Sequence, residues 1–169
     1  MESQPVELIV YGDFNCPFSA LASARVSRLE RIGAVRVDWR AVEHAPDLPP
    51  AGIALAGELA SEIERELEQI RGLLSVDEPD RLRLPARQPN TRLATAAFAA
   101  TPIADRPAVR DRLFAAHWSE GADLTEEATL ARLGATTIDT ATRPRALRQS
   151  RAGYQSRHSQ QKYSRVKSR

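Results

Sequence analysis

The sequence predicts an α/β fold that continues into a series of helices and ends in a basic tail. A strand, a helix and a second strand are expected within the first 42 residues, and amphipathic helices follow. Residues 143–169 contain nine Lys or Arg and no Asp or Glu, so residues 1–142 hold 15 basic and 22 acidic residues and a net charge of −7. The chain is therefore interpreted as an acidic folded body followed by a basic segment.

The first elements are a buried strand, an amphipathic helix and a second strand. Residues 6–11 form a nearly continuous apolar run, which is typical of a strand buried on both faces. Apolar residues recur at helical spacing from Pro17 onward, and Gly33 is placed to end this helix. Over residues 35–40 apolar side chains alternate with charged ones, which predicts a strand. A crossover of this length joins parallel strands.

The middle of the chain is predicted to be helical. After a Pro-rich connector, an apolar stripe over residues 55–74 lies opposite several glutamates and predicts a long amphipathic helix. Asn90 is placed to cap a helix over residues 91–100, and Pro107 suits the first turn of the next helix. Thr125 is followed by two glutamates, a pattern that favours one more short helix.

The apolar pattern decays after Gly134, and this sets the predicted domain organisation. Residues 1–44 form the β-α-β part, residues 45–134 the helical insertion and returning helices, and residues 135–169 a degenerate basic tail. Residues 135–142 are compatible with a brief strand. The rest of the tail has too few aliphatic residues for burial to offset its ordering entropy, so we expect it to be disordered. Nucleic-acid binding by the tail is not favoured, since few aromatic residues are interleaved.

Composition places the protein in a reducing compartment. Of its 169 residues, 42% are hydrophobic, which suffices for a core, and the single cysteine excludes an internal disulfide. No signal segment or long apolar run is present, so a cytoplasmic location without membrane association is expected. The three histidines have no ligand-like spacing, so no metal site and no bound cofactor are predicted.

Cys16 is the residue with the strongest chemical signal, because it lies where the first strand turns into the first helix. The pKa of a free thiol is about 8.5, and a helix N-terminus lowers it. Pro17 leaves the N–H groups of Phe18 and Ser19 free to face the sulfur, and the Ser19 hydroxyl is a second donor. The alternative is a small buried hydrophobic residue. Asp13 has two open interpretations: it tunes the thiol, or it only ends the strand.

The stretch "VYGDFNCPFSALAS" resembles the active-site turn of DsbA-like thioredoxin-fold proteins, a group that includes FrnE-type oxidoreductases, hydroxychromene carboxylate isomerases and kappa-class glutathione transferases. The segments "PNTRLATAAFAA" and "LFAAHWSEGADLTEEATLARL" extend the resemblance to about residues 6–134. It implies a thioredoxin-like fold with an all-helical insertion after the second strand.

The resemblance also implies a site and an activity. Cys16 matches the attacking thiol, and Ser19 stands where dithiol members have a resolving cysteine, so the type is monothiol. The resemblance further implies that the substrate is bound by Pro17, Phe18 and Asp13. The expected function is a thiol-disulfide oxidoreductase of low activity, with a small-molecule or protein thiol as substrate and glutathione as cosubstrate. The alternatives are a glutathione-dependent transferase or isomerase, and a degenerate, non-catalytic member acting through its tail.

The chain departs from this group in its C-terminal part. The family places a cis-proline before its third core strand, whereas the only proline after Pro107 is Pro144, which no apolar strand follows. The third and fourth core strands are not recognisable in the sequence. A sheet without them would have an exposed edge, so self-association, for example as a homodimer, is expected.

Overall fold

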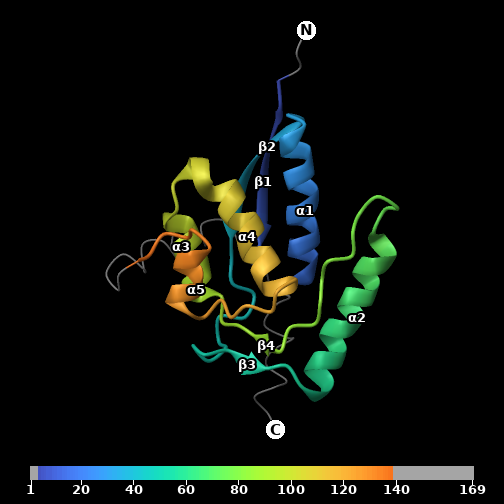
Figure 1. Cartoon of the computed structure of the whole chain (residues 1–169), viewed down its shortest axis with the longest axis vertical. Helices are drawn as coiled ribbons and strands as arrows, with labels where there is room; N and C mark the ends of the chain where they lie inside the picture. The colour runs from blue at the N-terminus through green and yellow to red at the C-terminus, as the bar shows by residue number, and fades with distance from the viewer. Residues whose placement is uncertain (1–3, 139–169) are drawn as a thin grey trace.

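The fold is built on a parallel pair of strands with helices packed against it (Figure 1). The computed structural model of the protein describes residues 4–138. Its elements, in chain order, are β1 (Val6–Gly12), α1 (Pro17–Arg31), β2 (Val35–Ala41), β3 (Ile53–Ala54), α2 (Gly57–Leu73), β4 (Arg87–Gln88), α3 (Arg92–Ala100), the 3₁₀ turn η1 (Ile103–Asp105), α4 (Arg106–Trp118) and α5 (Glu127–Arg132). These elements confirm the helices and the two main strands that the sequence predicts.

The crossover between β1 and β2 has the predicted parallel geometry. The strands pair in register from Val6 opposite Val35 to Gly12 opposite Ala41. Because the strands run the same way, the loops that follow β1 and β2 leave the sheet at the same edge. The first of these loops carries Cys16, so residues just after β2 are brought close to the thiol.

Gly33 ends α1 in a left-handed turn, as predicted. Its φ angle is 70°, and its N–H donates to the Glu30 carbonyl at 3.0 Å. The N–H of Ala34 donates to the Leu29 carbonyl, also at 3.0 Å. These two bonds satisfy carbonyls that the helix end would otherwise leave unpaired, and they direct the chain into β2.

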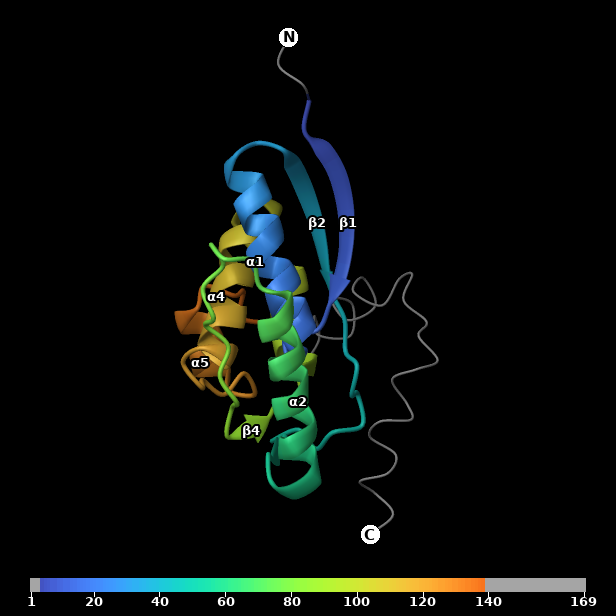
Figure 2. The same cartoon turned by 90° about the vertical axis from the view of Figure 1, so that its right-hand side faces the viewer.

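The prediction that β1 is buried on both faces is wrong. Val10 and Trp39 pack into the core on one face of the sheet, whereas Ile9 on the other face is 59% exposed. Figure 2 shows the labelled helices on one side of β1 and β2. An apolar run has no periodicity that would show whether one face or two are covered. Within residues 4–138 this sheet contains two strands.

A second, very small sheet closes the base of the α2 insertion. β3 and β4 are antiparallel, with Ile53 opposite Gln88 and Ala54 opposite Arg87. Neither strand is recognisable in the sequence, because two residues are too few to show an alternating pattern. Their pairing joins the segment that enters the insertion to the segment that returns from it.

The core is centred on an aromatic residue from the turn between β1 and α1. Phe14 has no exposed surface, and its ring centroid lies 5.6 Å from that of Phe98 and 5.1 Å from that of Phe114. Trp39 meets Phe114 edge to face at 5.5 Å. Burying an aromatic side chain of this size contributes about 1.5–3 kcal/mol. The buried Phe14 side chain therefore fixes the turn that carries Cys16 to the core.

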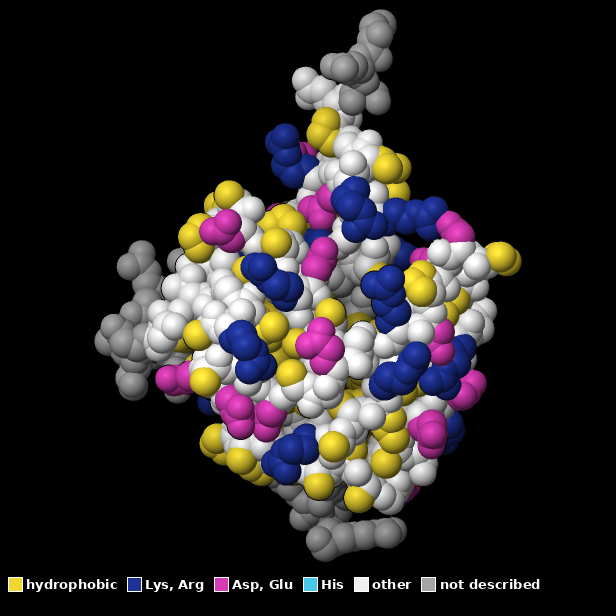
Figure 3. All heavy atoms as spheres, viewed as in Figure 1, with side chains coloured by type: hydrophobic (Ala, Val, Ile, Leu, Met, Phe, Trp, Pro, Cys, Tyr) yellow, Lys and Arg dark blue, Asp and Glu magenta, His cyan; other side chains and the backbone are white. Residues whose placement is uncertain are grey.

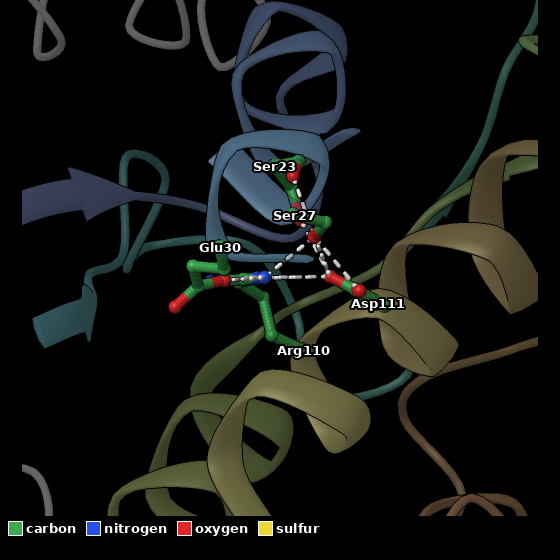
Figure 4. A network of polar contacts seen from close by, with 5 residues as sticks. All are labelled: Ser23, Ser27, Glu30, Arg110 and Asp111. Atoms are coloured by element: carbon green, nitrogen blue, oxygen red, sulfur yellow. Dashed lines mark hydrogen bonds and ion pairs between the residues drawn. The ribbon is translucent and has the colours of Figure 1, made fainter. Parts of the chain in front are cut away.

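A buried arginine joins α1 to α4 (Figure 4). Arg110 is 1% exposed, and its Nη2 donates to Glu30 Oε2 at 2.8 Å and to Ser27 Oγ at 2.6 Å. Its Nε donates to Asp111 Oδ1 at 2.9 Å. The hydroxyls of Ser23 and Ser27 donate to the same carboxylate at 3.2 Å and 2.7 Å. This network fixes the position of α1 along α4.

Several predictions concern residues outside the described part of the chain. The segment that the sequence predicts to be disordered, and Pro144, lie outside the described residues. The brief strand expected over residues 135–142 is described only over residues 135–138, which have no regular secondary structure. The division into regions at residues 44 and 134 stays a prediction. No helix within residues 4–138 is long and apolar enough to cross a membrane.

Candidate active site

The candidate site lies in the turn between β1 and α1, which is held at several points. The indole N–H of Trp118 donates to the Phe14 carbonyl at 2.9 Å. The side-chain amide of Asn15 donates to the Pro89 carbonyl at 3.2 Å. Both bonds reach from distant parts of the chain. The turn therefore presents Cys16 from a rigid support.

Cys16 is the N-cap residue of α1. It has extended backbone angles, and its carbonyl accepts the N–H of Ala20 at 3.1 Å, which begins the helical bonding pattern. Its own N–H donates to the Asp13 carbonyl at 3.1 Å. Pro17 is the first helical residue, as predicted. The thiol is half-buried and lies at the positive end of the helix dipole.

The environment of Cys16 lowers the pKa of its thiol. Burial is the largest single influence and raises the pKa, because a thiolate is poorly solvated away from water. Hydrogen bonds from the His44 side chain, the Ser19 hydroxyl and the Ser19 N–H, together with the charge of His44, act in the opposite direction and outweigh burial. The thiolate is therefore more populated near neutral pH than that of a free cysteine.

His44 is a site residue that the sequence does not reveal. His44 lies three residues after the end of β2 and reaches the thiol from the neighbouring strand end. Its backbone N–H donates to Asp13 Oδ2 at 2.6 Å. The parallel pairing of β1 and β2 was a usable signal, because it predicts that the residues after these two strands meet.

Asp13 is completely buried and ties three segments together. Its Oδ1 accepts the hydroxyl of Thr91 at 2.7 Å and the N–H of Asn15 at 3.3 Å, while Oδ2 accepts the N–H of His44. Burial raises the pKa of the Asp13 carboxyl, against the lowering effects of His44, Thr91 and Asn15. Asp13 directly follows β1 and also holds the loop that carries His44. It therefore ends the strand and, through His44, also acts on the thiol, so the two interpretations that the sequence leaves open are compatible.

The other predicted site residues differ in their exposure. Ser19 is buried, and both its hydroxyl and its N–H bond the thiol. Pro17 is buried beneath the turn, whereas Phe18 is 38% exposed beside Cys16. Of the three predicted substrate-binding residues, Phe18 is exposed, whereas Pro17 and Asp13 are buried.

The described residues contain no group of three or more His, Cys, Asp or Glu side chains placed to hold a metal ion. His117 is buried in α4, far along the chain from the thiol loop, and His158 lies outside the described range. The chemistry available at the candidate site is therefore that of a thiol, an imidazole and a hydroxyl.

A thiol that caps the first helix of a parallel β-α-β unit, with a helical insertion after the second strand, defines a thioredoxin-like domain. The chain belongs to the DSBA-like thioredoxin domain family, which it matches over residues 7–167. This match confirms the family and the fold class that the sequence predicts.

Among solved structures, the chain is similar to that of a selenomethionine form of 2-hydroxychromene-2-carboxylate isomerase (HCCA isomerase). The two chains share 23% sequence identity with a TM-score of 0.55, and the similarity covers 95% of this chain and 76% of that chain. This likeness establishes the fold. No curated protein matches the sequence.

Proposed function

We propose that the protein is a monothiol thiol-disulfide oxidoreductase in which Cys16 is the attacking residue. The observation that carries this proposal is the convergence of His44 and Ser19 on a half-buried thiol at the N-terminus of α1. A structural cysteine needs no such donors. Donors of this kind stabilise a thiolate, which is the nucleophilic form.

The proposed reaction begins with attack of the Cys16 thiolate on one sulfur of glutathione disulfide. A bond forms between the Cys16 sulfur and that sulfur, the original sulfur–sulfur bond breaks, and one glutathione thiolate leaves. The chain has no second cysteine, so an external thiol must resolve the mixed disulfide. That thiol, from a protein substrate, attacks the glutathione sulfur, so a disulfide between this substrate and glutathione forms and Cys16 leaves again as the thiolate.

His44 and Asp13 have separate parts in this proposal. His44 donates to the thiolate and stabilises its charge, whether the thiolate attacks or leaves. Asp13 does not reach solvent, and acts as a positioning residue by holding the His44 backbone. Ser19 supplies the second donor where a dithiol enzyme would have its resolving thiol.

The direct test is the intact mass of the protein after incubation with oxidised glutathione. Wild type should gain the mass of one glutathione, and the gain should disappear after dithiothreitol treatment. Cys16→Ser is the control that cannot form the adduct. Failure of folded wild type to form any adduct would contradict the proposal and favour a degenerate family member.

A second test separates two contributions to the lowered pKa of the Cys16 thiol: the hydrogen bonds from side-chain donors and the N-terminus of α1. The rate of iodoacetamide alkylation against pH should give wild type an apparent pKa below about 8.5, the value for a free cysteine. His44→Phe should raise this value, and Asp13→Asn should raise it less, because it only loosens the His44 loop. Arg36→Ala, on an exposed ion pair with Glu7, is the control and should leave the value unchanged.

Turnover distinguishes monothiol from dithiol chemistry. Wild type should reduce insulin disulfides poorly, since each cycle waits for an external thiol. Ser19→Cys should raise the rate if the missing resolving thiol limits turnover. Rapid turnover by wild type would argue against monothiol chemistry.

A glutathione-dependent isomerase or transferase is the second candidate, favoured by the structural similarity to HCCA isomerase. In that case glutathione would be bound and activated without a disulfide step. The Cys16→Ser variant discriminates, because it abolishes the mixed disulfide but keeps a hydroxyl able to donate to a glutathione thiolate. Conjugation of glutathione to an aryl halide that survives in Cys16→Ser would favour the transferase reading.

A further inference from the structure

A second region of the molecule has the dimensions of a ligand site. A pocket of about 550 Å³ lies between α1, α4 and the segment over residues 70–82. Pockets of about 300–1,000 Å³ hold small organic ligands. The lining begins on α1 at Ala20, one turn beyond the N-cap, and does not include Cys16, Ser19 or His44. A molecule in this pocket would not contact the thiol.

The inner wall of the pocket is apolar and well supported. Leu21, Ile70 and Phe114 are buried hydrophobic residues that line it, and Leu82 is half-buried against the same core. Phe114 is held by its ring contacts with Phe14 and Trp39. This wall is therefore preformed, and it suits a flat or aliphatic body that leaves water on binding.

The rim of the pocket carries charge that is mostly neutralised within the protein. Acidic and basic side chains are intermixed over this face of the molecule (Figure 3). Each of the four carboxylates in the lining has an arginine partner: Glu78 with Arg25, Asp77 with Arg28, Asp80 with Arg71, and Asp111 with Arg110. None of these carboxylates needs a cationic ligand.

Two arginines of the lining differ from the others. Arg31, at the end of α1, and Arg81, in the segment after α2, are exposed, and neither has a carboxylate partner within residues 4–138. Guanidinium groups bind carboxylates and sulfonates through paired hydrogen bonds. Arg31 and Arg81 are therefore the lining arginines that are available to an anionic ligand beside the apolar wall.

We propose that this pocket binds a small organic anion with an apolar, ring-sized body. The body packs against Leu21, Ile70 and Phe114, and the acidic group is held by Arg31 and Arg81. The proposal is independent of the chemistry at Cys16, because the two regions share no side chain.

The test compares three probes of the same size by isothermal titration calorimetry. Naphthalene-2-sulfonate is the anion, naphthalen-2-ylmethanol the neutral analogue and naphthalen-2-ylmethylammonium the cation. The anion should bind with a stoichiometry of one, and the cation should bind about tenfold more weakly or not at all. Equal affinity for the three probes, or no binding of the anion, would overturn the proposal.

Variants locate the binding. Arg31→Ala and Arg81→Ala should each weaken anion binding about three- to tenfold, as expected for one exposed charged contact. Ala24→Trp should abolish it, because Ala24 lines the pocket and is exposed, so the larger side chain fills the space without disturbing the core.

Matched controls lie on α5, away from the pocket lining. Arg132→Ala removes an exposed arginine and Ala128→Trp adds the same indole at an exposed alanine, and both should bind the anion like wild type. Circular dichroism establishes that each variant is folded. Anion binding that survives in folded Ala24→Trp would place the ligand elsewhere and refute the assignment.

Discussion

His117 should make the protein sensitive to acid. Its side chain is 2% exposed in α4, and burial lowers its pKa from 6.5 to about 4, although the Ala122 carbonyl and the charge of Asp123 act to raise it. The ring approaches the Ala122 carbonyl through Nδ1 at 3.5 Å, and Nε2 has no hydrogen-bond partner among the described residues. A proton on Nε2 would therefore be buried without an acceptor.

The size of the effect follows from the two pKa values. Between about pH 4 and pH 6.5 the unfolded chain binds a proton that the folded protein does not. Keeping His117 neutral therefore adds its full contribution to the free energy of unfolding above pH 6.5, and this contribution is lost as the pH falls toward 4. At about 1.36 kcal/mol for each pH unit, the loss amounts to about 3 kcal/mol.

The assay is urea unfolding followed by circular dichroism across this pH range, with His117→Phe as the comparison. Phenylalanine keeps an aromatic ring against Trp118, where the centroids are 4.9 Å apart, but does not titrate. Asp13 titrates with the opposite sign, since burial raises its pKa and its protonation favours the folded state, but it is common to both proteins. Wild type should lose about 3 kcal/mol more than the variant. Parallel loss in the two proteins would refute the reasoning.

Two further predictions concern stability, each measured by the same urea unfolding at neutral pH. Gly12→Ala should destabilise the fold by about 1–3 kcal/mol, because an added Cβ would lie 2.3 Å from Cζ2 of the buried Trp39. Its control, Gly72→Ala in α2, has open space and should stabilise by about 0.5–1 kcal/mol; similar effects at both positions would contradict the packing argument. Arg110→Ala should cost about 2 kcal/mol, less than a fully buried pair because its carboxylate partners touch solvent. Arg36→Ala, on an exposed pair, should cost under about 1 kcal/mol, and an equal loss in both would exclude a role for burial.

The sequence by itself determined the local structure. Helix starts and ends follow from the nature of single residues, as with Pro17 at the first turn of α1 and Gly33 in a left-handed conformation after it. Apolar periodicity predicted α2 and β2, and an apolar run predicted β1, because each of these patterns depends only on residues close together in the sequence. The position of Cys16 as a helix N-cap was therefore predictable, together with the family that its turn resembles.

Only the tertiary structure decided which distant residues share an environment. His44 reaches Cys16 because two parallel strands end side by side, and Asp13 meets Thr91 across 78 positions in the chain. Arg110 bonds Glu30 across 80 positions. Pairings of this kind depend on how the elements pack, and no periodicity encodes packing. For the same reason β1 could be recognised as a strand from its apolar run, whereas the exposure of one of its faces could not.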